Sequence, residues 1–323
     1  MSKEISVIIT AHNRKRYILD AIRSVLANNF PKDKLEIIVV KNYRDDYIDN
    51  EIEKLARLHN INIISLIEND TKLGKKIFTG IKNSQSEIIT FLEDDDLYLP
   101  SRLRTIATVF SKSKDLIFYH NMIKVLGNKR SRKLTFNYLH DKIISCDKDK
   151  LKNWRLLNKT EAKFNLSSMA FKKEILHSWI DIISRINLAL DNFFFYVALK
   201  EKGCMMIDNE PLTEFRATDK RDYVRDENEL LDFKKYIALK FYEDFSLFMN
   251  VFEDEPFNED IKGGMLFWFL EYKVLSKEIN ISVSLKLRNF LIHILKDKSL
   301  IALYLSSLLP FKIRKYLIYR YLV

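Results

Sequence analysis

Hydrophobic residues in the first hundred positions follow two alternating spacings. Short β-branched runs predict buried strands at residues 5–10, 35–40, 60–67 and 88–92, and apolar residues three or four positions apart predict helices between them. The predicted apolar helix faces are Ile18, Ala21, Ile22 and Val25; Ile48, Ile52, Leu55 and Leu58; and Ile77, Gly80 and Ile81. Strands that alternate with helices of this length predict a parallel sheet covered on both faces.

The fourth apolar run ends in four consecutive acids, Glu93, Asp94, Asp95 and Asp96. Like charges this close disfavour ionisation, and a fold tolerates them most easily where a cation neutralises them. Oxygen ligands of this kind suit Mg²⁺ or Mn²⁺, which often take further ligands from a diphosphate. The alternative is a solvated acidic turn, because charge runs are usually exposed.

Other polar residues follow the earlier predicted strands. His12, Asn13 and Arg14 come after the first, and Lys41 and Asn42 after the second. Ligands of parallel sheets bind beyond the carboxyl ends of the strands. We therefore expect these residues and the four acids to share one site.

In the second half, residues 165–171 form another predicted strand and residues 172–178 begin a helix. A further helix begins at Leu190-Asp191-Asn192 and ends near Lys202-Gly203, which predicts Asp191 as its N-cap. Spacing alone favours that structural role for Asp191. The apolar spacing of residues 226–280 predicts helices packed in a core.

Several ordered motifs resemble family 2 glycosyltransferases of the GT-A fold, an α/β, Rossmann-like, mostly parallel sheet flanked by helices. They are Val7–Arg14, Ala21–Leu26, Leu35–Val40, Leu73–Lys76, and Phe91–Asp96 with Leu99-Pro100. The resemblance covers roughly residues 3–220. It implies a catalytic domain at residues 1–225, followed by a helical C-terminal region at residues 226–323.

The resemblance implies inverting transfer from a nucleotide-diphosphate sugar. The family's metal-binding motif matches Glu93-Asp94-Asp95, so Asp95 and Glu93 are the expected ligands of Mg²⁺ or Mn²⁺, and Asp94 is an expected donor contact. The family's general base matches Asp191. A carboxylate there can accept the proton of the attacking hydroxyl.

Further expected donor-binding residues lie on the loops that this resemblance brings together. They are Thr10, His12, Asn13, Arg14, Asn42, Lys75, Arg216 and Lys220. Arg221 is a further candidate cation.

Three positions depart from the family pattern: Lys41 and Glu93 replace aspartates, and Leu190 replaces a glutamate. A lysine has no acceptor for the nucleotide base. Asn42, Asp45 or Asp46 could take that role, which leaves UDP- and GDP-linked donors open.

Two other functions compete with this interpretation. A nucleotidyltransferase would also place acids on a metal, but we expect a glycine-rich phosphate loop there, and Ala11-His12-Asn13-Arg14 contains no glycine. A catalytically silent nucleotide-sugar-binding module would explain the substitutions at Lys41, Glu93 and Leu190.

Composition sets outer limits. The 323 residues are 47% hydrophobic, enough for a large core and an appendage. The two cysteines, Cys146 and Cys204, lack metal-like spacing, and we expect no disulfide framework and a cytoplasmic, reducing compartment.

No basic and apolar leader precedes the first strand, so no signal peptide is expected. The formal net charge is +10, yet no nucleic-acid recognition motif is present, and no nucleic-acid partner is expected.

Positive charge is concentrated at the C-terminal end. Residues 281–323 contain eight lysines and arginines against Asp297 alone, interleaved with apolar and aromatic residues. The uncharged stretch 299–311 is too short to span a bilayer, which needs about 20 apolar residues. This pattern predicts peripheral attachment to anionic lipid on the cytoplasmic face of the membrane, with a glycan or lipid-linked acceptor. The alternative is a helical cap packed on the rest of the protein.

Overall fold

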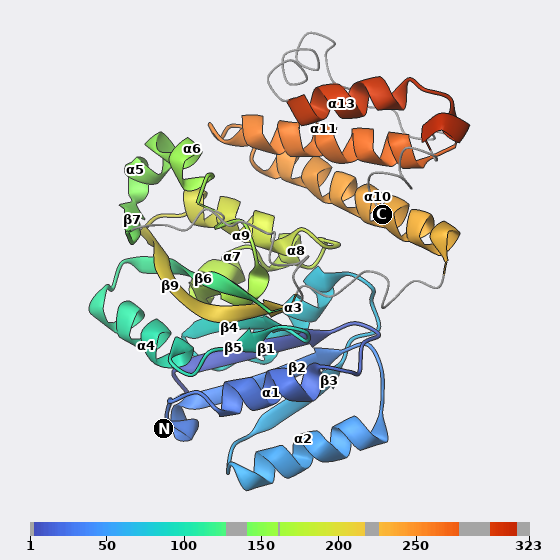
Figure 1. The fold of residues 1–323 in the computed structure, drawn as a ribbon. Coiled ribbons are helices and arrows are strands. Elements are labelled where there is room, and N and C mark those ends of the chain that lie inside the picture. The colour runs from blue at the N-terminus through green and yellow to red at the C-terminus, as the bar shows by residue number, and fades with distance from the viewer. Residues whose placement is uncertain (1–2, 127–140, 161, 217–225, 278–297, 315–323) are drawn as a thin grey trace. The chain divides into compact units, whose positions relative to one another are not determined.

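The computed structural model describes residues 3–126, 141–160, 162–216, 226–277 and 298–314 (Figure 1). The chain forms two compact units, residues 1–186 with 190–218 and residues 187–189 with 219–323. The first unit is an α/β domain and the second is helical. Each unit is described by itself below.

The first unit begins with strands and helices in strict alternation. They are β1 (Ile5–Ala11), α1 (Ile18–Leu26), β2 (Leu35–Lys41), α2 (Asp46–Leu58), β3 (Ile63–Ile67), α3 (Leu73–Asn83) and β4 (Ile88–Glu93). A 3₁₀ turn, Lys32–Lys34, precedes β2. Strand β1 lies between β2 and β4, and all four strands are parallel. The alternation predicted from the sequence is confirmed.

Later strands turn the parallel sheet into a mixed one. The remaining elements of this unit are β5 (Leu97–Tyr98), α4 (Arg102–Lys112), β6 (Leu116–Leu126), β7 (Ile143–Cys146), α5 (Asp147–Lys152), α6 (Trp154–Leu157), a 3₁₀ turn (Leu166–Ser168), β8 (Met169–Lys172), α7 (Lys173–Ser178), α8 (Ile180–Ile183), α9 (Leu190–Lys200) and β9 (Cys204–Arg216). The strand order is β3-β2-β1-β4-β8-β6-β9-β5, and β7 pairs with β9. Strand β8 is antiparallel to both β4 and β6.

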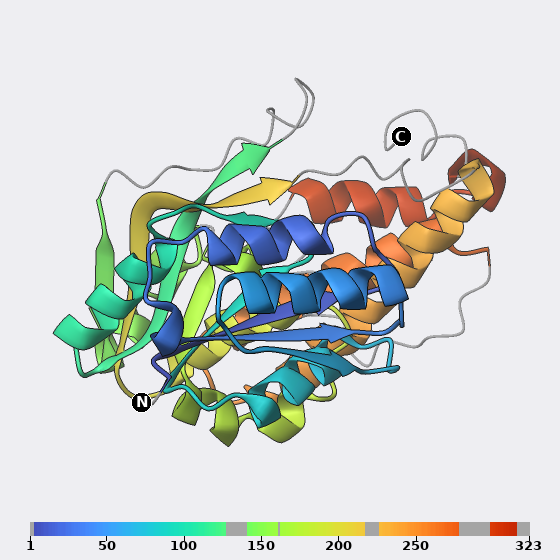
Figure 2. The same cartoon turned by 90° about the horizontal axis from the view of Figure 1, so that it is seen from below.

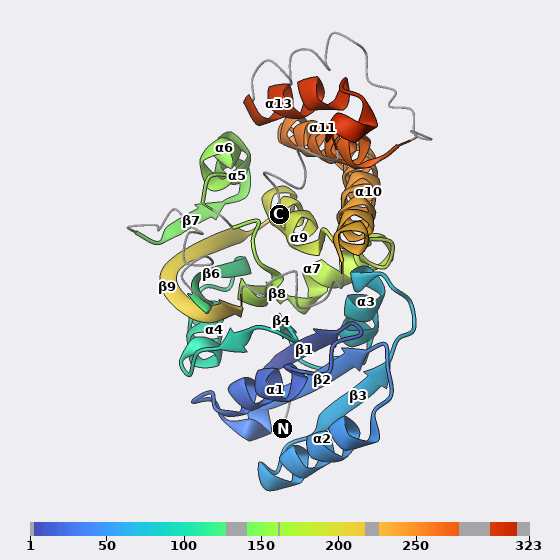
Figure 3. The same ribbon diagram turned by 45° about the vertical axis from the view of Figure 1, so that its right-hand side comes forward.

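Helices cover both faces of the sheet, as Figures 2 and 3 show for α1 and α2 on one face of β1–β3 and α3 on the other. Alternate strand residues, such as Val7 and Ile9, join the buried faces of α1, α2 and α4 in one core. Ile8 points to the opposite face, where α3 approaches so closely that a Cβ on Gly80 would lie 2.5 Å from the Ile8 side chain. Gly80 therefore lies on the packed face of α3, as predicted.

Four local predictions were wrong. Residues 60–62 precede β3 instead of belonging to it, and residues 166–168 form a 3₁₀ turn before the short strand β8. Leu58 lies at the end of α2 and is 77% exposed. Cys146 and Cys204 form a disulfide between β7 and β9, where the antiparallel register sets them opposite each other. Spacing along the chain contains no sign of that register, which is why the pair was not expected.

The second unit contains α10 (Glu227–Val251), α11 (Asn258–Leu275) and α13 (Lys298–Ser307). Asp226 caps α10 by accepting hydrogen bonds from the backbone N–H groups of Asn228 and Glu229. Phe241 of α10 stacks on Trp268 of α11 with ring centroids 4.4 Å apart. Leu231 and Ala238 of α10 are buried in this unit, whereas Phe233 is 41% exposed.

Among the described residues, no helix combines the length and apolar content that a membrane span requires.

Candidate active site

The four acids lie where β4 leaves the sheet beside the end of β1. The backbone N–H of Asp94 donates to the Thr10 carbonyl, and the N–H of Asp96 donates to the Glu93 carbonyl in a tight turn. Burial of the whole of β4 up to Leu92 fixes its register, so the acids emerge together at the carboxyl edge.

The carboxylate of Asp96 is held by hydrogen bonds from other residues of the protein. Its carboxylate accepts hydrogen bonds from Asn165 Nδ2 at 2.6 Å, Ser167 Oγ at 2.7 Å and the Arg216 backbone N–H at 3.0 Å. The side chain is buried, and burial followed by repulsion from Asp95 raises its pKa to about 6. These bonds tie three segments together, so Asp96 has a structural role.

Asp94 and Asp95 share the guanidinium of Arg14. Arg14 contacts both carboxylate oxygens of Asp95, with Nη2 at 3.0 Å from Oδ1, and also lies 2.5 Å from Asp94 Oδ1. The other oxygen of Asp94 is buried and accepts no hydrogen bond from the residues that the structure describes. Burial raises the pKa of Asp94 to about 7, although Arg14 acts to lower it.

Glu93 and Asp191 complete the acidic cluster from two distant parts of the sequence. Burial, followed by repulsion from Asp96, Asp95 and Asp191, raises the pKa of Glu93 well above its ordinary value. The Glu93 backbone N–H donates to Ser167 Oγ. Asp191 lies on the first turn of α9, and its negative charge contributes to the raised pKa of Glu93.

Asp191 is not the N-cap of α9, contrary to the expectation, because the helix begins at Leu190. Its Oδ1 accepts hydrogen bonds from the backbone N–H and the side-chain amide of Asn192, at 2.8 and 2.9 Å. Burial raises its pKa to about 6, opposed by those two hydrogen bonds and by Lys163. Asp191 is therefore largely ionised near pH 7 and suited to accept a proton.

Arg216, at the end of β9, approaches the acidic turn from the other side. Its Nε donates to the Asp95 carbonyl at 3.0 Å, and its guanidinium lies over the Tyr17 ring, 4.3 Å from the centroid. Together Arg14 and Arg216 place two permanently charged groups beside the acids.

The loops after β1 and β2 are joined by a pair of amides. The Asn13 backbone N–H donates to Asn42 Oδ1, and Asn42 Nδ2 donates to Asn13 Oδ1, both at 2.8 Å. Asn13 has a left-handed backbone conformation with φ of 55°, which asparagine tolerates. His12 is exposed in the same loop, and the Thr10 side chain is buried.

Two charged residues near the end of β2 are held in ion pairs. Lys41 is buried, with Nζ 2.7 Å from Asp49 Oδ1 and 3.1 Å from the Tyr43 carbonyl. Asp45 accepts from the Ile48 N–H at the start of α2 and pairs with Lys15 at 2.7 Å. Of the acids considered as replacements for a base-binding carboxylate, only Asp46 is exposed.

Lys75 and Lys220 are the two remaining donor-binding candidates. Lys75 lies on α3 with its ammonium 5.5 Å from the centre of the Phe78 ring. Lys220, like Arg221, lies outside the described residues. The residues that sequence reasoning missed are Tyr17, Lys163, Asn165 and Ser167. Asn165 and Ser167 belong to the segment predicted as a buried strand, so their position along the chain did not mark them as part of a site.

Glu93 and Asp95 are the residues expected to bind the divalent ion that the motif implies. In the described part of the chain, no group of three acidic, histidine or cysteine side chains is arranged to hold a metal. The Asp95 and Glu93 carboxylates nevertheless supply hard oxygen donors in a region with surplus negative charge, and the chemistry of these donors fits Mg²⁺ or Mn²⁺. Arg14 already contacts Asp95, so any ion there must share or replace that contact.

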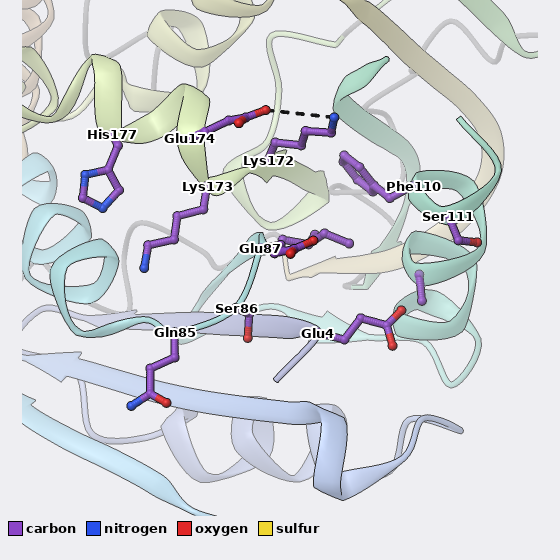
Figure 4. A pocket seen from close by; sticks show the side chains of 12 residues that line it. Glu4, Gln85, Ser86, Glu87, Phe110, Ser111, Lys172, Lys173, Glu174 and His177 are labelled. Carbon is purple, nitrogen blue, oxygen red and sulfur yellow. Dashed lines mark ion pairs between the residues drawn. The ribbon is translucent and has the colours of Figure 1, made fainter. Parts of the chain in front are cut away.

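A pocket of about 820 Å³ lies elsewhere, at the amino ends of β1 and β4 (Figure 4). Glu4, Ser86 and Glu87 line it just before these strands begin, and Lys172 and Lys173 line it from β8 and α7. Lys173 Nζ donates to the Ser84 carbonyl at 2.5 Å. Because ligands of such sheets bind at the carboxyl ends, we assign no catalytic role to this pocket.

Comparisons with known proteins bear on the family and the fold of the chain. A sequence profile described as glycosyl transferase family 2 matches residues 6–177, more than half of the chain. A protein of Rickettsia conorii named as an uncharacterized glycosyltransferase is 31% identical over 128 residues, which cover 38% of this chain and 20% of that protein. The poly(ribitol-phosphate) β-N-acetylglucosaminyltransferase TarS of Staphylococcus aureus is 25% identical over 122 residues, covering 38% of this chain and 21% of TarS.

Solved structures show the same fold. The crystal structure of S. aureus TarS 1–349 with UDP-GlcNAc has a TM-score of 0.58 at 14% identity, covering 98% of this chain and 91% of that one. The mannosyltransferase PcManGT of Pyrobaculum calidifontis with GDP-Man and Mn²⁺ has a TM-score of 0.55 at 13% identity, covering 99% and 88%. The expected GT-A fold is thereby confirmed, and with the profile match it follows that the chain belongs to glycosyl transferase family 2.

Proposed function

We propose that the protein is an inverting glycosyltransferase that moves a sugar from a UDP- or GDP-linked donor to a hydroxyl acceptor. The observation that carries this proposal is the gathering of Glu93, Asp94 and Asp95 at the carboxyl edge of the sheet, where the charge of Asp191 also acts on Glu93. Carboxylates outnumber cations there, which favours a bound cation and a proton acceptor in one place. The UDP-GlcNAc and GDP-Man of the structural neighbours support this donor class.

In this proposal, Asp95 and Glu93 hold Mg²⁺ or Mn²⁺. When bound, such an ion stabilises the negative charge that develops on the departing diphosphate. Arg14 and Arg216 carry positive charge to the same place, and Arg forks match phosphate oxygens. Asp94 lies beside them as a donor contact.

Asp191 acts as the general base. Its carboxylate accepts the proton of the acceptor hydroxyl while that oxygen bonds to the anomeric carbon. The bond between this carbon and the diphosphate oxygen breaks, and its electron pair leaves with the nucleoside diphosphate. Attack opposite the leaving group inverts the anomeric centre and needs no covalent intermediate.

The rest of the donor is assigned to the neighbouring loops. We place the nucleotide against Thr10, His12, Asn13 and Asn42, where the paired amides offer acceptors that Lys41 cannot. Lys75 and Lys220 remain proposed donor contacts.

Donor hydrolysis separates this function from its rivals. Purified protein with Mn²⁺ and either UDP-GlcNAc or GDP-Man should release the corresponding nucleoside diphosphate. A catalytically silent module would bind the donor, detected as a thermal shift, without any release. A nucleotidyltransferase would instead consume a nucleoside triphosphate and release pyrophosphate.

A second proposal concerns the location of the enzyme. We propose that it acts on a glycan or lipid-linked acceptor while docked on anionic lipid at the cytoplasmic face of the membrane. Beyond the charge of residues 281–323, the structure shows a patch of exposed apolar side chains at and after the end of α13, here called the α13 patch: Leu305, Leu308, Leu309 and Ile313. Apolar side chains beside basic residues suit an interfacial segment.

The test needs point variants. Leu300 of α13 is buried against α11, so truncation would expose core and confuse the result. Wild-type protein should sediment with anionic vesicles at low salt and dissociate as salt rises, because attraction between basic residues and lipid is screened within a Debye length. Leu305→Gln with Leu308→Gln should abolish sedimentation, whereas Leu58→Gln, a control at an exposed leucine of α2, should not.

Equal sedimentation of the double variant and wild type would contradict the docking proposal. A shift of the double variant from dimer to monomer, without any change in vesicle binding, would assign the α13 patch to a second copy of the chain.

A further inference from the structure

The strongest ion pair of the site joins the two groups that are expected to act on different partners. Arg14 Nη1 and Nη2 contact the two oxygens of Asp95, and Nη2 also contacts Asp94. Asp95 is the carboxylate that the proposed function gives to the metal, and Arg14 is a cation that it gives to the diphosphate. While both Asp95 oxygens remain on Arg14, each group is engaged by the other and not by its proposed partner.

The backbone of Arg14 is anchored, while its side chain is accessible. The Tyr43 hydroxyl donates to the Arg14 carbonyl at 2.6 Å. The guanidinium side chain is 27% exposed, against 13% for Asp95 and 1% for Asp94. The side chain therefore bridges from the β1 loop to the acidic turn at a place that an incoming ion can reach from solvent.

A metal ion and the guanidinium would repel each other on the same carboxylate. Both are cations, and at contact distance in a partly buried site this repulsion is only weakly screened. The two oxygens have further lone pairs, yet the bidentate Arg14 contact already directs a positive group at each.

We propose that Arg14 is a resident counter-ion of Asp95 that a divalent metal must displace. In the protein without ligands, Arg14 neutralises Asp95 and keeps metal affinity low. When the nucleotide-diphosphate donor binds, its phosphates offer Arg14 another anionic partner, so that Asp95 becomes available. Donor and metal then strengthen each other's binding through one side chain, and the coupling is reciprocal. This inference rests on the proposed function only in assigning Asp95 to the metal.

Mn²⁺ binding to protein without nucleotide provides the test, with free Mn²⁺ measured by electron paramagnetic resonance. Arg14→Gln should bind Mn²⁺ more tightly than wild type by about tenfold or more, a common size for such coupling. Added UDP should strengthen Mn²⁺ binding by wild type, and by clearly less in Arg14→Gln.

Arg16→Gln is the matched control. Arg16 belongs to the same loop and is exposed over Tyr17, so its replacement removes the same charge without touching Asp95. Its affinity for Mn²⁺ should stay within about twofold of wild type, as screening weakens charges that are not in contact. An equal gain of Mn²⁺ affinity in both variants would show that the effect comes from net charge alone, and it would overturn the proposal.

Arg14→Lys keeps the charge but loses the two-pronged contact, and it should lie between wild type and Arg14→Gln. Because it is the milder change, it retains the test if Arg14→Gln unfolds. Unchanged or weaker Mn²⁺ binding in a folded Arg14 variant would show that Arg14 does not compete with metal.

Asp95→Asn distinguishes the failure of this inference from failure of the proposed function. It should abolish Mn²⁺ binding in the Arg14→Gln background as well. If Mn²⁺ binding survives Asp95→Asn, or if no protein binds Mn²⁺, the metal assignment itself is wrong.

Discussion

The loops after β2 and β4 leave the same edge of the sheet, and both regions carry several charged residues. They differ in how far those charges are paired with neighbouring residues of the protein. In the β2 loop, Lys41 pairs with Asp49, and Asp45 pairs with Lys15 while capping α2. In the β4 loop, Asp96 is tied into the structure, whereas Asp95 and Asp94 share one arginine beside Glu93.

Position at this edge of the sheet is therefore not enough to give a loop a functional role. Both loops lie where a parallel sheet binds ligands, yet only the β4 loop retains negative charge that its own neighbours do not balance. Burial of that excess raises the pKa values of Glu93, Asp94 and Asp191. An excess of buried like charge destabilises a fold unless a ligand or a proton compensates it, which is why such clusters mark functional sites.

The largest expected effect is at Asp191. Asp191→Asn should lower the rate of transfer by roughly two to four orders of magnitude, as is typical for loss of a general base, while donor affinity is retained. Because burial raises the pKa of Asp191 to about 6, wild-type kcat/KM should fall as pH decreases through about 6 and the carboxylate takes up a proton. The variant should lack this acidic limb.

Asp181→Asn serves as the control, since Asp181 is an exposed acid near the start of the short helix α8. Its kinetics should match those of wild type. A collapse of donor affinity in Asp191→Asn would show that Asp191 binds the donor instead of the acceptor proton.

The next largest effect compares one acid from each loop. Asp95→Asn should lose metal-dependent turnover by about a hundredfold or more while remaining folded, because it removes a ligand from a site with surplus negative charge. Asp45→Asn, the same change in the β2 loop, should leave turnover close to wild type. Initial rates over a range of Mn²⁺ concentrations give the comparison, and similar rates for both variants would remove the distinction between the loops.

Asp96 should behave as part of the fold. Asp96→Asn replaces a buried acceptor of three hydrogen bonds, and it should lower the free energy of unfolding by about 1–3 kcal/mol. Urea denaturation should show a change below about 0.5 kcal/mol for the control Asp46→Asn, at the exposed first residue of α2. Normal stability with lost turnover would place Asp96 in the ligand site instead.

The smallest expected effect is that of the α2 cap. Asp45→Ala should lower the free energy of unfolding by about 1 kcal/mol, since it removes the acceptor for the Ile48 N–H. Turnover and the KM for the donor should not change. A raised KM, measured under conditions in which the variant is fully folded, would instead indicate that Asp45 contacts the nucleotide.

Much of the fold could be predicted from local patterns. The β-branched runs at residues 5–10, 35–40 and 88–92 predicted strands of one parallel sheet, which placed the polar residues that follow at one edge. That these strands are neighbours is seen in the structure. The ordered motifs also predicted the family, which the profile match confirms. These features depend on neighbours within a few residues, where sequence spacing determines which side chains share a face.

The sequence could not decide which polar groups compensate one another. Asn165 and Ser167 hold Asp96, Arg14 reaches Asp95 from 81 positions away, and Asp191 meets Glu93 across almost a hundred residues. The disulfide between Cys146 and Cys204 likewise depends on the register of two strands. The sequence by itself determined the strands, the loops and the candidate acids, because local spacing sets them. Only the tertiary structure decided which charges remain uncompensated, because that depends on contacts between segments far apart in the chain.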